Sequence, residues 1–210
     1  MDRPKALTVS QDGRHVYVVS HTNALCTFAR EAKSGELTLL KGERDTNVNG
    51  IRLPADRGLN YPTAIVEIEN KLYIADHDKV ALWEHTEESP EFVKLWWNDK
   101  HGVRGIGKAT ALAITPEYRL WVAGTGDGQL AWFDRLNSRG VLSFGGSLPV
   151  PGLIDVATSG DGRFVYAISP KSLVVVTTEP AVAKKADLPY SLPSLDSPRQ
   201  ELPDVPRAQP

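Results

Sequence analysis

Residues 10–20 are Ser-Gln-Asp-Gly-Arg-His-Val-Tyr-Val-Val-Ser, an Asp-Gly turn followed by a run of β-branched and aromatic residues. Asp-Gly favours a tight turn, whereas Val and Tyr favour extended strands. The same combination returns at residues 160–169, which are Gly-Asp-Gly-Arg-Phe-Val-Tyr-Ala-Ile-Ser. Two copies of one turn and strand, far apart in the chain, indicate a protein that is built from repeats.

Outward from these two copies, four repeats align. One aligned position is always aromatic and holds Tyr17, Tyr73, Trp121 and Tyr166; a second holds Phe28, Trp83, Phe133 and Val176. The expected strands are 6–9, 16–20, 24–30 and 36–40; 64–67, 72–76, 80–85 and 92–96; 111–114, 120–124, 129–135 and 141–144; and 154–157, 165–169 and 173–178. Four short strands in roughly every 50 residues predict an all-β fold of four β-propeller blades, with the aromatic side chains packed between blades.

The repeats place the blades at about 6–62, 63–108, 109–152 and 153–180. Residues 181–185, Ala-Val-Ala-Lys-Lys, are the one candidate for the outer strand of the fourth blade. Residues 181–210 are rich in proline, which predicts an extended tail. The tail is either a linker or a strap across a protein surface, and in a strap the apolar anchors would be Leu188, Tyr190, Leu192 and Leu195.

Charge and composition exclude several classes of protein. The 24 basic and 26 acidic residues give a net charge of -2, so nucleic acid is not an expected partner. The single cysteine, Cys26, forms no internal disulfide. No apolar run is long enough to span a bilayer, and the first residues do not resemble a signal peptide. We therefore expect a soluble, cytoplasmic protein without a membrane partner.

Three segments of the first repeat resemble a known family. They are residues 10–20 above, residues 25–30 (Leu-Cys-Thr-Phe-Ala-Arg) and residues 34–40 (Ser-Gly-Glu-Leu-Thr-Leu-Leu). They are similar to the repeat of lactonase-type (6-phosphogluconolactonase-like) β-propellers, and residues 161–166 repeat the match. The resemblance implies a ring that usually has seven blades, with acidic, histidine and arginine side chains that open a lactone at the central channel. It covers the blade scaffold and carries no catalytic residue over to this chain.

Four blades where the resemblance implies seven leave three arrangements open. The blades form a small closed ring, an open arc completed by a second copy or another polypeptide, or part of a longer ring. Because the chain has few blades, a tail and no catalytic constellation, we expect a non-catalytic interaction module, a scaffold or accessory subunit without a cofactor. The alternative is a lactonase-like hydrolase or sugar-acid binder whose channel carboxylates would be Glu67 and Asp155.

Two further groups of residues are candidates for binding. The long segments 43–62 and 98–108 carry a basic, partly aromatic set that would form a ligand or partner face: Arg52, Arg57, Tyr61, Lys100, His101, Arg104 and Lys108. Asp76, His77 and Asp78 are possible metal ligands at one turn. A metal site needs three or four converging ligands, so we expect these three to be turn residues in solvent and predict no metal.

Overall fold

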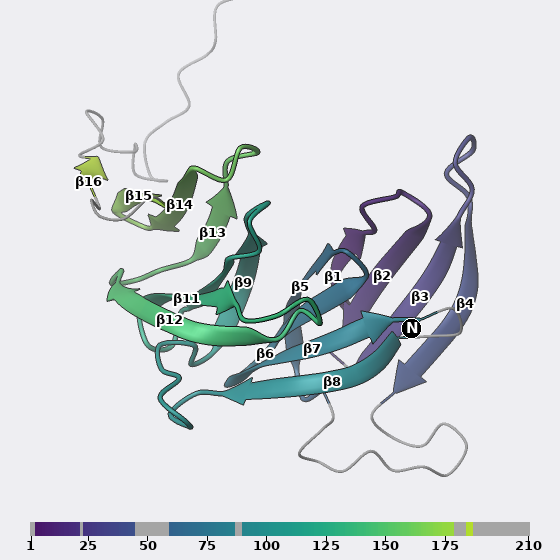
Figure 1. Ribbon diagram of the computed structural model, residues 1–210, viewed down its shortest axis with the longest axis horizontal. Coiled ribbons are helices and arrows are strands. Elements are labelled where there is room, and N and C mark those ends of the chain that lie inside the picture. The colour runs from purple at the N-terminus through teal and green to yellow at the C-terminus, as the bar shows by residue number, and fades with distance from the viewer. Residues whose placement is uncertain (1–2, 22, 45–58, 87–89, 179–183, 187–210) are drawn as a thin grey trace, which may run out of the picture.

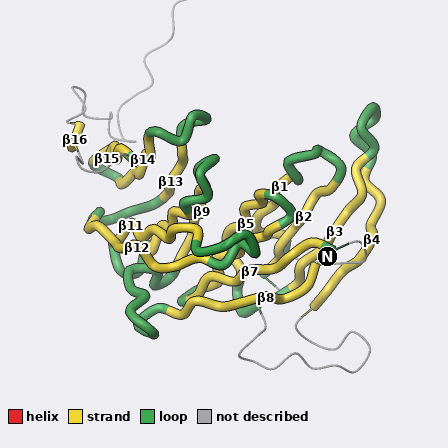
Figure 2. Tube along the Cα trace, in the orientation of Figure 1, coloured by secondary structure: helices red, strands yellow, loops and turns green. Residues whose placement is uncertain are grey.

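The computed structural model describes residues 3–21, 23–44, 59–86, 90–178 and 184–186. In these ranges every regular element is a strand, and the strands form four sheets of four (Figure 2). Each sheet is an antiparallel meander that follows chain order, which confirms the predicted propeller blades. The described part of the chain holds no helix, and so none that is long and apolar enough to cross a membrane.

Each blade runs from an inner to an outer strand. Blade 1 consists of β1 (Pro4–Val9), β2 (His15–Ser20), β3 (Ala24–Arg30) and β4 (Leu37–Arg44). Blade 2 consists of β5 (Pro62–Ile68), β6 (Lys71–Asp76), β7 (Lys79–His85) and β8 (Pro90–Trp97). Blade 3 consists of β9 (Ala109–Ile114), β10 (Leu120–Gly124), β11 (Gln129–Arg135) and β12 (Leu142–Pro149). Blade 4 consists of β13 (Asp155–Thr158), β14 (Phe164–Ser169), β15 (Ser172–Thr177) and β16 (Lys184–Ala186).

The blades form an open arc, with blade 1 at one end and blade 4 at the other (Figure 1). Of the three arrangements expected from the sequence, the small closed ring is therefore not the one observed. The inner strands β5, β9 and β13 run side by side in the same direction. Thr63 Oγ1 donates to the carbonyl of Ala109 (2.6 Å), near the starts of β5 and β9. Thr158 Oγ1 donates to the carbonyl of Ile114 (3.2 Å), at the ends of β13 and β9.

The space between successive blades is filled by the predicted aromatic positions. Tyr17, Tyr73 and Trp121 are at most 2% exposed, and each packs with residues of the next blade in one of three apolar clusters. The Tyr73 hydroxyl also donates to the carbonyl of Gly140 in blade 3, at 2.7 Å. Burying rings of this size supplies a large part of the stability of such an interface.

Strand pairing makes positions in different blades directly comparable. Asp155 pairs with Ile168, and Ala64 pairs with Ala75. These two pairs are equivalent, because Ile168 and Ala75 each lie two residues after the aligned tyrosine of their blade. The fourth inner strand is therefore shifted by one residue from the alignment expected from the sequence, which set Ile154 opposite Ala64. Strand β16 lies inside the predicted tail 181–210 and completes the fourth sheet by pairing with β15. The proposed tail anchors Leu188, Tyr190, Leu192 and Leu195 lie outside the described residues.

Candidate functional site

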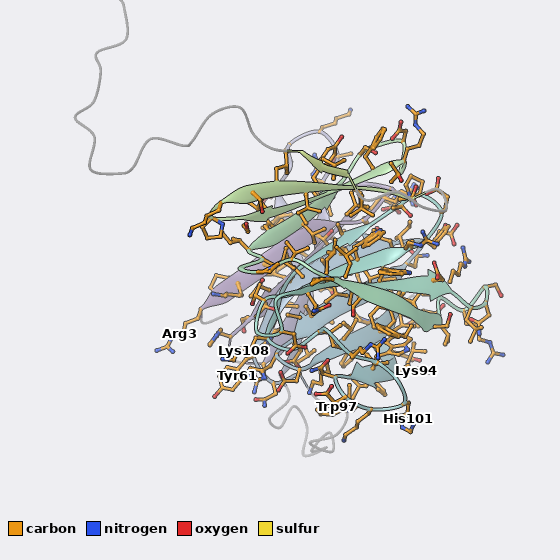
Figure 3. The ribbon with its side chains drawn as sticks, turned by 90° about the vertical axis from the view of Figure 1, so that its left-hand side faces the viewer. Arg3, Tyr61, Lys94, Trp97, His101 and Lys108 are labelled. Atoms are coloured by element: carbon orange, nitrogen blue, oxygen red, sulfur yellow. The ribbon has the colours of Figure 1, made fainter. Side chains whose placement is uncertain are left out.

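The inner strands begin at one end of the blades, which we call the entry face. It carries the loop 98–108 between β8 and β9, the tips of hairpins β6–β7 and β10–β11, and residues 60–61 before β5. Figure 3 shows Tyr61 and Lys108 projecting from the same side of the ribbon. Loops that connect successive blades in this way are common places for binding residues on a rigid scaffold.

The loop 98–108 is held against the β10–β11 hairpin of blade 3 by the side chain of Asn98. Asn98 Nδ2 donates to Asp127 Oδ2 (3.1 Å), and Asn98 Oδ1 accepts from the backbone amide of Ile106 (3.1 Å). Asp127 Oδ2 also accepts from the amide of Gly107 (2.8 Å). A side chain on Gly107 would collide with the Asp127 carboxylate, so this close approach requires glycine. The loop therefore has a fixed position on blade 3.

Two adjoining hollows lie along this contact, and together we call them the blade 2–3 depression. The larger has a volume of about 470 Å³ and the smaller about 250 Å³. Both are lined by Asp99 and Asp127. The larger adds Arg104, Gly105, Gln129 and Ser147, and the smaller adds Asp78, Asn98, Gly107, Lys108 and Gly126. The volume of the larger hollow is in the range of small-molecule sites.

The depression combines three carboxylates, from Asp78, Asp99 and Asp127, with the cationic groups of Arg104 and Lys108. The backbone amide of Lys108 donates to Asp78 Oδ1 (3.2 Å), which joins the tip of blade 2 to the same loop. Asp99 and Lys108 have positive φ angles of 59° and 48°. Eight other non-glycine residues of the described chain also have positive φ angles, so this conformation is not specific to the depression.

The structure brings together part of the predicted ligand face. Arg104 and Lys108 both line the depression. Lys100 instead places its ammonium group 4.9 Å from the centre of the Trp97 ring, and His101 is exposed on the loop. Tyr61 packs edge-on against His21 of blade 1, with ring centres 5.1 Å apart. The predicted residues Arg52 and Arg57 lie outside the described residues.

The three possible metal ligands do not converge. Asp76 is fully buried, accepts from the amide of Asn60 and forms an ion pair with Lys79 at 3.2 Å. Burial raises the pKa of the Asp76 carboxyl. His77 and Asp78 are half-exposed and pair with each other at 2.7 Å. Among the described residues, no group of three or more His, Cys, Asp or Glu side chains is placed to hold a metal ion.

The channel carboxylates Glu67 and Asp155 also lie apart. By register, Asp155 in blade 4 is equivalent to Ala64 in blade 2. Glu67 lies three residues further along its own inner strand, which corresponds to about 10 Å at the usual rise per residue. Both Glu67 oxygens accept backbone hydrogen bonds at 2.8 Å, from Gln11 of blade 1 and from Asn70 in its own turn. Glu67 thus fixes two turns. A joint catalytic role for this pair stays a prediction that their placement does not favour.

Sequence reasoning missed the residues that complete the depression: Asn98, Asp99, Gln129 and Ser147. It also missed Asp127, which lines both hollows. A signal was present in the glycines at 102, 105 and 107 and at 124, 126 and 128, because glycine is often used where two backbone segments approach closely. Gly126 donates from its amide to the carbonyl of Gly107 at 2.9 Å, at the centre of that approach.

No protein-family model and no curated protein matches this chain. Solved structures do. A proposed 6-phosphogluconolactonase from Bacteroides fragilis superposes with a TM-score of 0.67 at 18% identity, over 87% of this chain and 55% of that one. One from Bacteroides uniformis gives 0.67 at 14% identity, over 86% and 55%. The periplasmic gluconolactonase PpgL of Pseudomonas aeruginosa gives 0.64 at 17% identity, over 88% and 55%.

These neighbours correct one expectation. From the sequence we expected a non-catalytic interaction module, and this prediction is wrong, because the three structures above are named as a gluconolactonase or as proposed 6-phosphogluconolactonases. One neighbour is periplasmic by name, so the cytoplasmic location stays a prediction. The chain spans about 55% of the length of these proteins, and at this level of identity it has the fold of the lactonase-type β-propellers.

Proposed function

We propose that this chain binds a sugar acid and hydrolyses the corresponding sugar lactone at the blade 2–3 depression. The observation that carries the proposal is the convergence of Arg104 and Lys108 with Asp78, Asp99 and Asp127 around one hollow that is anchored by Asn98. The activity named for the neighbouring structures supports the class of substrate. Their activity belongs to longer chains, so its extension to this chain is our inference.

The lining of the depression suits a polyhydroxylated anion. Carboxylate oxygens accept hydrogen bonds from sugar hydroxyl groups, and the side-chain amide of Gln129 and the hydroxyl of Ser147 both donate and accept. A guanidinium group binds a carboxylate through two parallel hydrogen bonds, which gives Arg104 the role of holding the acid group or the lactone carbonyl. Lys108 adds positive charge in the adjoining hollow. An apolar ligand would find few partners here.

Hydrolysis at this site needs one base and one cation. Asp127 Oδ2 is occupied by two hydrogen bonds from protein groups, and we assign its other oxygen, Oδ1, to accept a proton from water. The oxygen of that water forms a bond to the lactone carbonyl carbon, and Arg104 stabilises the negative charge that develops on the carbonyl oxygen. The bond from carbon to the ring oxygen then breaks, and the ring oxygen takes the proton back from Asp127. The product is an open-chain hydroxy acid.

The test is the rate of glucono-δ-lactone hydrolysis by the full chain, measured above the buffer rate with a pH indicator. Asp127→Asn and Arg104→Ala are expected to lower kcat/KM at least tenfold. Asp155→Asn is the matched control, because it removes an exposed carboxylate on an inner strand outside the depression. Loss of activity in Asp155→Asn with full activity in Asp127→Asn would move the site to the channel. Gluconate binding without turnover would reduce the function to that of a binding protein.

A further inference from the structure

Blades 1 and 4 lie at the two ends of the arc (Figure 1). In the described part of the chain, each of them has a sheet face with exposed apolar side chains. Blades 2 and 3 each pack one face against the preceding blade and the other against the following blade. Blade 4 contributes one face to these clusters, and so does blade 1. We call the face of a blade that contacts the following blade its leading face, and the face that contacts the preceding blade its trailing face. The exposed end faces are therefore the leading face of blade 4 and the trailing face of blade 1.

The leading face of blade 4 consists of Tyr166, Ile168, Leu173 and Val175, which the register of β14 and β15 places together. Tyr166 is 36% exposed and Ile168 is 41% exposed. At the positions equivalent to these two residues, the other blades bury every side chain to 2% exposure or less: Tyr17 and Val19 in blade 1, Tyr73 and Ala75 in blade 2, and Trp121 and Ala123 in blade 3. In those blades the next blade covers them.

The trailing face of blade 1 consists of Leu7, Val16, Val18, Phe28, Leu37 and Leu39. Leu7 is 63% exposed and Leu37 is 47% exposed. By register, their equivalents in blade 3 are Leu112 and Leu142, which are 8% and 2% exposed because they pack on blade 2. The trailing face of blade 1 therefore has apolar residues at the positions that blade 3 uses to pack against blade 2.

The equivalence between the end faces and the blade 2–3 interface also includes one hydrogen bond. Between blades 2 and 3, the Tyr73 hydroxyl donates to the carbonyl of Gly140, which lies two residues before β12. Blade 1 has Gly35 two residues before β4, and both glycines have a φ of 74°. Tyr166 is the blade 4 equivalent of Tyr73. Docked in the same way, the Tyr166 hydroxyl would therefore reach the carbonyl of Gly35.

We propose that the leading face of blade 4 docks on the trailing face of blade 1 of a second copy of this chain, and that two such contacts close a ring of two copies. Both halves of the contact occur on one chain, so a two-fold rotation forms both contacts at once. The ring would have eight blades, within the usual range for propellers of about four to eight. The contact does not depend on the lactone chemistry.

The test is the solution mass of the purified full chain by light scattering on a sizing column. The expected mass is twice the 23.0 kDa of the chain. Ile168→Glu on the leading face and Leu39→Glu on the trailing face should each reduce the mass to that of one chain while the circular dichroism spectrum is unchanged. Leu136→Glu is the matched control, because Leu136 is 62% exposed and belongs to neither face, and it should leave the mass doubled.

Mixing the two monomeric variants tests the polarity of the contact. A pair made of one Ile168→Glu copy and one Leu39→Glu copy keeps one unaltered interface, so the mixture should partly recover the doubled mass. A wild-type monomer at about 100 µM would overturn the proposal, and so would a dimer that survives both substitutions. If the mixture recovered none of the doubled mass, that result would contradict the proposed pairing of a leading face with a trailing face. Oligomers that grow with concentration would contradict closure by two copies.

Discussion

Tyr73 and Tyr17 occupy equivalent positions in successive blades, yet their hydroxyl groups have opposite surroundings. The Tyr73 hydroxyl donates to Gly140 at 2.7 Å, whereas the buried Tyr17 hydroxyl has no hydrogen-bond partner in the described part of the chain. Both side chains are fully buried. We predict that the same substitution, tyrosine to phenylalanine, has different effects at the two positions.

Tyr73→Phe leaves the buried Gly140 carbonyl without its donor, which should cost about 1–3 kcal/mol of unfolding free energy. With a slope near 2 kcal/mol per M, the urea midpoint should fall by about 0.5–1.5 M. Tyr17→Phe removes a hydroxyl whose unpaired burial itself costs about 1–3 kcal/mol, so that variant should be as stable as the wild type or more stable.

The assay is urea unfolding followed by tryptophan fluorescence and circular dichroism, at one protein concentration for all variants. Equal slopes in the two variants and the wild type are the control that the unfolding reaction is unchanged. The account of the blade interface would be refuted if Tyr17→Phe lost as much stability as Tyr73→Phe. It would also be refuted if Tyr73→Phe were neutral.

Asn98→Ala should raise amide hydrogen exchange at residues 103–107 and weaken gluconate binding, because the Asn98 side chain anchors this loop; unchanged exchange would contradict that role. Gly124→Ala sets a methyl group against the carbonyl of Gly105 and should cost about 1–3 kcal/mol in urea unfolding, whereas Gly160→Ala has open space and should be close to neutral, so equal effects would argue against close packing. Hydrogen bonds from Ser159 first and then Arg163 lower the pKa of Asp161 from 3.8 to about 2. The unfolded chain therefore binds more protons between these values, and stability should fall as the pH falls from 4 to 2. Asp161→Asn should flatten this slope in urea unfolding, and an unaltered slope would show that Asp161 does not contribute.

The fold was predictable from the sequence because each blade repeats a local pattern. The turn before Tyr17 and the turn before Tyr166 are short-range signals, and strand pairing sets both residues at the same position of their blades. The end of β12 was less predictable. Gly145 and Gly146 suggest the end of a strand at residue 144, yet the strand continues to Pro149 past an irregularity in its register. The two glycines leave room for the Trp132 indole, and a contact across the sheet is not a local pattern.

The candidate site was predictable in part for the same reason. Arg104 and Lys108 stand out as charges in a long loop, so the sequence places them on a binding face. Their carboxylate neighbour Asp127 lies on the next blade and joins them because Asn98 and Gly107 hold the loop against that blade. That contact depends on how blades 2 and 3 pack, which no spacing within either segment reveals. Glu67 shows the converse, because a carboxylate on an inner strand is used to fix turns.

Amide hydrogen exchange with and without saturating gluconate is the most direct test of where the ligand binds, because it does not require turnover. The account predicts slower exchange in residues 98–108 and 124–129, which border the depression, and unchanged exchange in the inner strands at 62–68 and 155–158. Protection confined to the inner strands would contradict the account and assign the ligand to the channel. No protection anywhere would contradict sugar-acid binding by this chain.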